Sequence, residues 1–425
     1  QNIADATAYS ASLVHARELN YIAYTNRAMI ANQVLIAQSI SLISWARFAS
    51  DLTDKIETLS KLAGPAAPFL VGGLQVALNS VEAGLESAEI ALRGYIVAVD
   101  GVIDLLSFSQ KAMHIGSVAA IQNTIRTIAA ENDASVELSG LIANSTMGLG
   151  QAKNFNFIEE VHLNHHLALN DQKEHHKKMN QMKEMILSSR DDFSKIRQQK
   201  AEVYIVPINT KLRLQYHGST AMTEKFLGKG YYNWAAIDTL SLHIGKPKDG
   251  LFSGRKWIEV PIASGAAQVA RETSTENYFD DFYGQNNMGL NFKSKSKTDL
   301  NSTFEKNKLA SKIAISSKDS HENIYKRLGG LRKFYVISEE GLIDQTPGFI
   351  VVLKKTQKNK IIQREKKVEL VAMAKAAARF ERPSDLFPRV DGLREYGSLL
   401  SPYWSGKLVD ISEPEKSIIR MSSKI

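Results

Sequence analysis

The chain has 425 residues, of which 44 % are hydrophobic, so it is long enough for two or three domains and has ample material for a core. It contains no cysteine, which excludes disulfides, thiolate zinc sites and cysteine nucleophiles. The formal net charge of +8 is unevenly spread, because residues 1–150 hold 8 basic and 13 acidic side chains. The basic excess lies in lysine-rich loops without interleaved aromatic residues, so we expect no nucleic-acid partner.

Residues 1–200 are expected to form a bundle of long helices. Residues 1–63 contain neither Gly nor Pro, and their apolar residues recur at helical spacing, which predicts one very long helix or two nearly continuous ones. A second helical stretch is predicted over about 71–130, and a strongly polar third helix over about 153–200. Segment 88–106 is apolar but contains charged residues, among them Arg93, Asp100 and Asp104, so we expect it to be a buried or bundled helix.

After residue 200 the pattern changes to the period of β-strands. Short β-branched or alternating segments, separated by turn residues, predict an antiparallel β domain over 201–425. The predicted strands are 202–208, 211–218, 234–245, 256–264, 333–338, 348–355 and 367–381. A Ser/Lys/Asn-rich stretch, about 273–322, is expected to be a surface excursion of this domain. The predicted fold class is therefore α+β, with an N-terminal bundle of long α-helices followed by an antiparallel β-rich domain.

A histidine-rich segment, 159–179, holds five of the ten histidines of the chain. On a helix, Glu159, His162 and His166 fall at i, i+3 and i+7, so one face could offer three ligands to a transition metal. Leu163 stands where a zincin helix carries Glu, and no further ligand is identifiable, so a polar exposed helix is the preferred interpretation. Phosphate-binding loops and nucleophile elbows do not occur in the sequence, which therefore indicates neither catalytic residues nor a cofactor.

The first predicted helix is unusually polar over residues 15–33, HARELNYIAYTNRAMIANQ. A stripe at helical spacing lies opposite an apolar face, and its members are Arg17, Asn20, Tyr24, Arg27, Ala31, Val34 and Gln38. The stripe either faces solvent or contacts a neighbouring helix. Solvent-facing helices favour Lys and Glu, and neither Lys nor an acid occurs between Glu18 and Asp51, so we prefer a helix-interaction role for the polar members. Asn26 lies off the stripe and is unexplained at this level.

The two ends of the chain resemble a known family. Residues 1–34, QNIADATAYSASLVHARELNYIAYTNRAMIANQV, are similar to the start of the extracytoplasmic part of TadE/TadG-like Flp (tight adherence) pilus-assembly proteins of bacteria. Residues 380–410, FERPSDLFPRVDGLREYGSLLSPYWSGKLVD, resemble the closing pattern of that group, in which a Pro-Tyr-Trp element precedes a basic-Leu pair. The resemblance covers about 65 residues, and the rest agrees only in broad layout.

The resemblance implies a non-enzymatic, exported protein that acts as a minor pilin-like or assembly component of a surface filament. It implies an extracytoplasmic location, partners that are further copies or pilin-like proteins contacted through N-terminal helices, and a membrane anchor expected only upstream of Gln1. From the residues themselves, Tyr403 and Trp404 in the C-terminal tail are expected to pack as an anchor against the body. Two alternatives stay open: an adhesin whose β domain recognises a surface ligand, and a histidine-cluster metal-binding protein.

Overall fold

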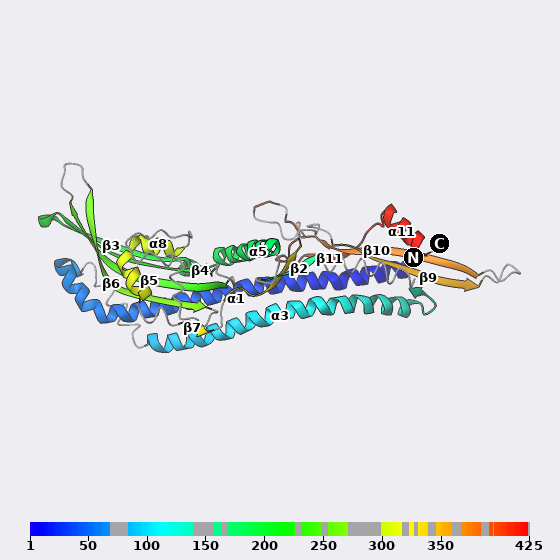
Figure 1. Cartoon of the computed structure of the whole chain (residues 1–425), viewed down its shortest axis with the longest axis horizontal. Coiled ribbons are helices and arrows are strands. Elements are labelled where there is room, and N and C mark those ends of the chain that lie inside the picture. The colour runs from blue at the N-terminus through cyan, green and yellow to red at the C-terminus, as the bar shows by residue number, and fades with distance from the viewer. Residues whose placement is uncertain are drawn as a thin grey trace. The chain divides into compact units, whose positions relative to one another are not determined.

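The computed structural model describes residues 1–68, 84–138, 157–162, 169–225, 231–247, 254–270, 299–316, 323–326, 330–338, 346–358, 367–383, 391–393 and 395–423 (Figure 1). A long N-terminal helix is followed by antiparallel sheets, so the predicted α+β class is confirmed. The chain divides into two compact units. The first unit comprises Gln1–Met29, Leu105–His162 and Lys333–Ile425, and the second comprises Ile30–Asp104 and Leu163–Arg332.

The two units do not follow the predicted division at residue 200. Two helices, α1 (Asn2–Ala63) and α3 (Leu85–Asn132), each contribute one part to the first unit and the other part to the second. Within each unit the helical part buries apolar residues against strands that come from distant regions of the chain. A boundary drawn from changes in composition along the sequence cannot detect units that are interleaved in this way.

Two of the three predicted helices are present. The helix predicted over 1–63 is confirmed by α1, which ends at the short 3-10 turn η1 (Gly64–Ala66). Gly64 has a φ of +51° and is followed by proline, so the chain leaves the helix there. The prediction over 71–130 corresponds to α3, and its first part, 71–83, lies outside the described residues.

The third prediction, one helix over 153–200, is wrong. The described part of this segment contains β2 (Ile158–Val161), α5 (Leu169–Ser188), α6 (Asp192–Lys195) and the start of β3 at Ile196. Asp191 caps α6 by accepting a hydrogen bond from the Ser194 backbone N–H, which starts a new helix after α5. Residues at both ends of the segment instead pair as strands with partners far along the chain.

The first unit contains two antiparallel sheets. A four-stranded sheet has the order β1-β9-β10-β11, and β2 pairs with β8. β8 (Phe334–Ile337), β9 (Phe349–Lys358) and β10 (Lys367–Phe380) confirm the strands predicted over 333–338, 348–355 and 367–381. The structure adds β1 (Glu137–Leu138), β11 (Trp404–Leu408) and helix α11 (Glu413–Ser423), for which no prediction was made.

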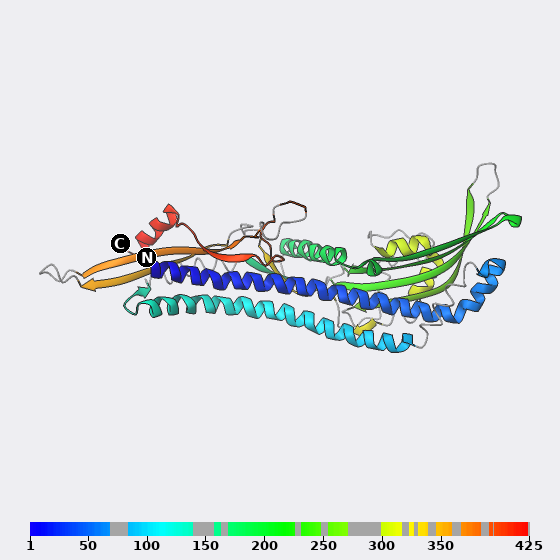
Figure 2. The same cartoon turned by 180° about the vertical axis from the view of Figure 1, so that it is seen from behind.

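The core of the first unit lies between α1, α3 and the four-stranded sheet (Figures 1 and 2). Small side chains dominate the contribution of α1, where Ala4, Ala8 and Ala11 follow one another at helical spacing. They pack with residues of α3 and with β9 residues such as Phe349. Gly406 in β11 extends this close packing, because a Cβ at that position would lie 2.5 Å from the Ser12 hydroxyl. The backbone of α1 therefore runs close to the sheet.

The second unit is built on a five-stranded sheet of order β3-β4-β5-β6-β7. Its strands are β3 (Ile196–Ile205), β4 (Thr210–Lys225), β5 (Tyr231–Pro247), β6 (Arg255–Ala270) and β7 (Asn323–Lys326). The first four form an antiparallel meander and confirm the strands predicted over 202–208, 211–218, 234–245 and 256–264. β7 pairs with β6 in parallel. The prediction of an antiparallel sheet is therefore wrong for this one pair of strands.

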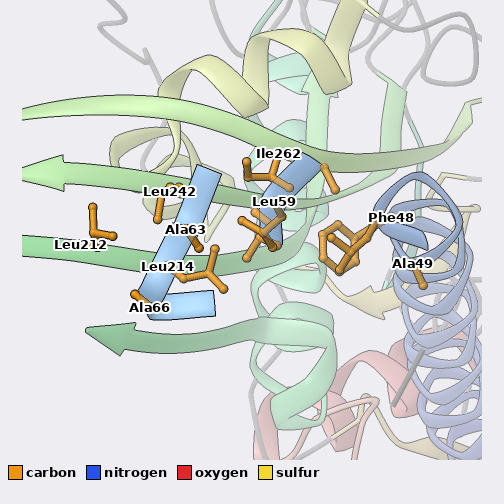
Figure 3. Close-up of a cluster of buried hydrophobic side chains, with 12 residues drawn as sticks. Phe48, Ala49, Leu59, Ala63, Ala66, Leu212, Leu214, Leu242 and Ile262 are labelled. Carbon is orange, nitrogen blue, oxygen red and sulfur yellow. The ribbon is translucent and has the colours of Figure 1, made fainter. Parts of the chain in front are cut away.

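One face of this sheet is covered by the second part of α1. Phe48, Leu52 and Leu59 of the helix are buried in one cluster with leucines of β4 and β5. Figure 3 shows the cluster, in which helical side chains face Leu212, Leu214, Leu242 and Ile262. Full burial of one such side chain stabilises the fold by roughly 1.5–3 kcal/mol, so this contact is a main source of stability for the second unit.

A polar row crosses the same face where α1 comes closest to the strands. Arg197, Gly218, Asp238 and Gly265 are register partners on β3, β4, β5 and β6. The fully buried Asp238 carboxylate accepts hydrogen bonds from Arg197 Nε at 2.7 Å and Nη2 at 2.9 Å, and from Ser44 Oγ of α1 at 2.6 Å. A Cβ at Gly218 would overlap that carboxylate. The row thus pairs a buried charge and fixes α1 on the sheet in one step.

Two short helices, α8 (Asp299–Lys306) and α9 (Lys308–Ser316), cover the other face of the sheet. Phe304 and Ile315 are buried there against residues such as Ala235 and Ile237. These helices fall inside the predicted surface excursion, about 273–322, so that prediction is wrong for 299–316. The remainder of the excursion, 273–298 and 317–322, lies outside the described residues.

Among the described helices, the stretch Asn2–Ala66 is the one long and apolar enough to cross a bilayer. Half of its most apolar window is buried inside the protein. The contacts of α1 with the sheets account for this apolar composition, since core helices also need long apolar surfaces.

Gly265 tests how closely α1 approaches the sheet. A Cβ at this position would overlap backbone atoms of Ser44 and Phe48, which cannot rotate away as a side chain can. We expect Gly265→Ala to lower the free energy of unfolding of the second unit by about 2 kcal/mol or more, measured by urea denaturation of the whole chain. Gly254→Ala is the control, because nothing lies within 4 Å of its added Cβ. Equal stability of the two variants would contradict the close approach.

Candidate interaction surface

The outward face of α1 in the first unit is rich in tyrosine and arginine. We call this surface the Tyr/Arg face; its members are Tyr9, Arg17, Tyr21, Tyr24 and Arg27, all exposed. Tyr24 is 61 % exposed. Within the described part of the chain, neither arginine joins a hydrogen bond or an ion pair, so both guanidinium groups are available to another molecule. Tyr and Arg are the residue types that most often dominate the energy of protein interfaces.

Two predicted members of the interaction stripe have partners within the chain instead. Asn20 donates a hydrogen bond from Nδ2 to the carbonyl oxygen of Trp404 at 2.8 Å, and its Oδ1 accepts one from the Trp404 backbone N–H at 2.9 Å. Gln38 lies in the second unit, where its Nε2 donates to Asp191 Oδ2 at 2.9 Å. Both residues set the position of α1 within its own unit. The stripe therefore reduces to Arg17, Tyr24 and Arg27 as groups that face outward.

The buried Asn26 secures α1 to strand β8 and to the segment that precedes β11, both in the first unit. Its Nδ2 donates to the carbonyl oxygens of Tyr335 at 3.0 Å and Leu399 at 2.7 Å, while its Oδ1 accepts a hydrogen bond from Gln110 Nε2 at 2.7 Å. Its backbone partners are more than 300 residues away in the chain, which is why sequence periodicity gives no sign of this role. An amide of this kind fixes one register between elements, because any slip leaves its partners unpaired.

Gln33 has the equivalent role in the second unit. Its Oε1 accepts a hydrogen bond from the indole N–H of the fully buried Trp234 at 2.9 Å, and its Nε2 donates to the Gly330 carbonyl oxygen at 2.9 Å. The sequence places Gln33 on the apolar face of the helix, where its polarity looks like an exception. The structure explains it as the partner that a buried tryptophan needs.

A buried charged cluster joins α1 to α3 in the first unit. The Glu18 carboxylate contacts His15 Nδ1 at 3.1 Å and His114 Nδ1 at 2.5 Å, and accepts a hydrogen bond from Ser117 Oγ at 2.6 Å. Burial by itself raises the pKa of Glu18. The hydrogen bonds from His114 and His15, the positive charge of His15 and the bond from Ser117 outweigh that effect and lower the pKa to about 2. Glu18 is therefore an ionised buried acid that ties the two helices together.

The predicted histidine face does not exist as a helical face. Glu159 lies in strand β2 opposite Val336, and His162 follows the strand, with its Nδ1 3.2 Å from the Glu160 carbonyl oxygen. His166 lies outside the described residues. Pairing of β2 with β8 removes the helical spacing that would have aligned the three ligands. In the part of the chain that the structure describes, His, Asp and Glu form no group of three suited to a metal ion.

Another buried histidine lies between the five-stranded sheet and α8. His217 contacts Thr303 Oγ1 through Nδ1 at 2.9 Å and Ser302 Oγ through Nε2 at 3.2 Å. Burial, followed by the positive charges of Lys306 and Arg197, lowers its pKa to about 4, so the ring is neutral at physiological pH. A serine next to an imidazole is the start of a nucleophilic site, but a hydroxyl replaces the carboxylate that orients the ring in such sites. The contacts favour a role in holding α8.

The C-terminal aromatic pair belongs to the core of the first unit. Trp404 is buried, and its ring packs edge-on against Phe157 and Phe380 with centroid distances of 6.0 and 5.5 Å. Tyr403 is partly buried beside the same cluster. Together with the two hydrogen bonds of Asn20, these contacts fasten the end of the chain to its first helix.

The Glu18 cluster predicts a defined dependence of stability on pH. Since the pKa of Glu18 in the folded chain, about 2, is below its ordinary value of 4.5, the charged carboxylate stabilises the fold above pH 4.5. This stabilisation, on the order of 3 kcal/mol, is lost as the pH falls from 4.5 towards 2. Urea denaturation across that range measures it, and the Glu18→Gln variant should lack this part of the pH dependence. Identical pH profiles for the two proteins would refute the assignment.

The role of Asn26 predicts a large effect on stability from a substitution that keeps the branched shape of the side chain and removes its hydrogen-bonding groups. Asn26→Leu leaves two buried carbonyl oxygens without their donor and removes one acceptor of the Gln110 amide, which keeps Thr25 Oγ1, so we expect a loss of about 3 kcal/mol or more in the free energy of unfolding. The control is Tyr24→Leu two residues earlier on the same helix, where an exposed side chain should give a change within about 0.5 kcal/mol. Chemical denaturation of both variants decides the matter, and similar values for the two would count against a register role for Asn26.

Comparison with known proteins identifies no relative of this chain. No protein-family model, no curated protein and no solved structure matches it. What the Tyr/Arg face does is accordingly argued from its own side chains.

Proposed function

We propose that the protein is a non-enzymatic structural or assembly component of a bacterial Tad/Flp-type pilus or a related surface filament, and that it associates through its N-terminal helix. The observation that carries the proposal is the Tyr/Arg face. Arg17 and Arg27 stand ten residues apart on one rigid helix, about 15 Å, with tyrosines between them. The resemblance of residues 1–34 and 380–410 to the TadE/TadG-like group supplies the biological setting.

The chemistry of this face favours a protein partner with carboxylates at matching spacing. Each guanidinium can bind a carboxylate with two parallel hydrogen bonds, and each tyrosine offers a hydroxyl next to an apolar ring. The tyrosines are exposed although α1 buries another face against the rest of its unit, so burial within this chain is not what selects them. A pilin-like subunit or another copy of the chain, presenting an acidic helix face, fits these requirements.

Filament assembly in cells tests the proposal. We expect Arg27→Ala, alone or combined with Tyr24→Ala, to reduce the number of filaments at least several-fold, because the lost groups contribute binding energy and no packing within the chain. The matched control is Arg126→Ala, which removes an exposed arginine from α3 in the same unit. Filaments are counted by electron microscopy of cells that make the full chain, and the stability of each variant is checked by denaturation.

Two results would overturn the proposal. Normal filament numbers in the double variant would show that the Tyr/Arg face is not needed for assembly. Normal filaments combined with lost attachment of cells to surfaces would favour the alternative of an adhesin. Deletion of residues 201–425 cannot separate the two functions, because the first unit takes strands β8 to β11 from that region.

A further inference from the structure

Helix α3 presents an outward face that is apolar and uncharged. We call it the α3 stripe; at steps of three or four residues it consists of Ile90, Gly94, Val97, Gly101, Leu105, Phe108, Ala112, Ile115 and Ala119, every one of them exposed. Its largest members, Leu105 and Phe108, are 65 % and 68 % exposed. Solvent-facing helices ordinarily carry Lys and Glu at such positions, and a continuous exposed apolar surface of this kind marks a site of association.

The glycines of the stripe indicate close contact with another helix. A glycine in the middle of a helix destabilises it by about 1 kcal/mol relative to alanine. An added Cβ at Gly94 or Gly101 would meet nothing within 4 Å, and neither residue has a positive φ. Neither the backbone nor the packing of the described residues therefore requires glycine at these positions. Small residues between large apolar ones are suited to a second helix that packs its own large side chains into the gaps.

One edge of the stripe carries two exposed charges of opposite sign, Asp104 and Lys111. They are seven residues apart and so lie on the same side of the helix. Asp104 and the buried Asp100 both bind Arg332, and the Asp104 side chain remains 58 % exposed. Lys111 joins no hydrogen bond or ion pair with a described residue. The edge thus carries one exposed charge of each sign.

We infer that the α3 stripe binds the α3 stripe of a second copy of this chain in antiparallel orientation. With the two-fold axis near residues 107 and 108, Asp104 of each copy lies beside Lys111 of the other, because equivalent edges meet in an antiparallel pair. The same register places Ile115 over Gly101 and Val97 opposite Ala119, so large residues meet small ones. A parallel pair brings opposite edges together, so Asp104 of one copy would lie away from Lys111 of the other and this attraction would be lost.

This inference goes beyond the proposed function and does not depend on it. Self-association through α3 is a property of the purified chain, whereas the filament role concerns the Tyr/Arg face on α1 and is measured in cells. A chain that dimerises but whose Tyr/Arg variants still assemble filaments would overturn only the proposed function. A monomeric chain whose Tyr/Arg variants lose filaments would overturn only the dimer.

Sedimentation equilibrium of the full chain tests the dimer. We expect a concentration-dependent dimer for the unaltered protein and at least a tenfold weaker association for Leu105→Glu. Leu393→Glu is the matched control, since Leu393 lies in the same unit and is 66 % exposed, against 65 % for Leu105. A monomer at concentrations near 100 µM, or an equal loss of association in both variants, would overturn the inference.

Cysteine cross-linking tests the orientation, and the absence of native cysteine makes every cross-link assignable. In the antiparallel register, Phe108→Cys lies next to its own counterpart and should form a disulfide-linked dimer under oxidation. Val97→Cys alone should not, whereas a mixture of Val97→Cys and Ala119→Cys chains should. Efficient cross-linking of Val97→Cys with itself would indicate a parallel pair and overturn the proposal. These substitutions lie at exposed positions, so the test does not depend on the Leu105→Glu variant folding.

Discussion

The structure depends on hydrogen-bonding side chains that lie on the buried side of α1. In each unit, polar groups with buried partners hold the helix in one position. In the first unit these groups are Glu18, whose partners outside its own helix lie on α3, and Asn26; in the second unit they are Gln33 and Ser44. Apolar packing supplies most of the stabilising energy, but it tolerates small shifts along a helix. A buried carboxylate or amide does not, because a displacement of a few ångströms leaves it without partners at a cost of about 1–3 kcal/mol per group.

This constraint also separates the two sides of α1 by function. The polar residues on the buried side form hydrogen bonds within the chain. Asn20 and Gln38, at the margin of that side, also form hydrogen bonds within the chain. The residues that remain outside, such as Tyr24 and Arg27, are those for which the described part of the chain offers no partner. The interaction role that we propose therefore belongs to a narrower surface than the whole polar stripe, and a substitution there separates binding from folding.

Much of the fold follows from local sequence signals. The absence of Gly and Pro over 1–63 was sufficient to predict α1, and alternation with turn residues predicted seven strands at nearly their observed positions. Segment 153–200 was mispredicted because polarity was interpreted as an exposed helix, although β2 and β3 need only short segments that find partners elsewhere. The short helices α8 and α9 were missed because a Ser/Lys/Asn-rich composition conceals the few apolar residues that they bury.

The candidate interaction and metal-binding residues were likewise predictable from the sequence only in part. Helical spacing placed Arg17, Tyr24 and Arg27 on a common face, and that arrangement is observed. It could not separate them from Asn20, because the partner of Asn20 is a backbone group 384 positions later in the chain. The Glu159, His162 and His166 face failed for a related reason, since it assumed one helix where strand pairing with a distant segment decides the local structure. Long-range hydrogen bonds leave no periodic signal in a sequence.

The bond between Asn20 and Trp404 also sets an order of events in time. A ribosome delivers residue 20 long before residue 404, so α1 emerges with its anchoring partner not yet made. At synthesis rates of about 5–20 residues per second, that interval is on the order of 20 to 80 seconds. Closing so long a loop is a slow step for the chain alone. The chain loses conformational entropy before the contacts between residues 20 and 404 form and compensate for the loss. Until residue 404 emerges, the side of α1 that Trp404 covers is as open as its Tyr/Arg face, and whatever escorts the nascent protein meets both.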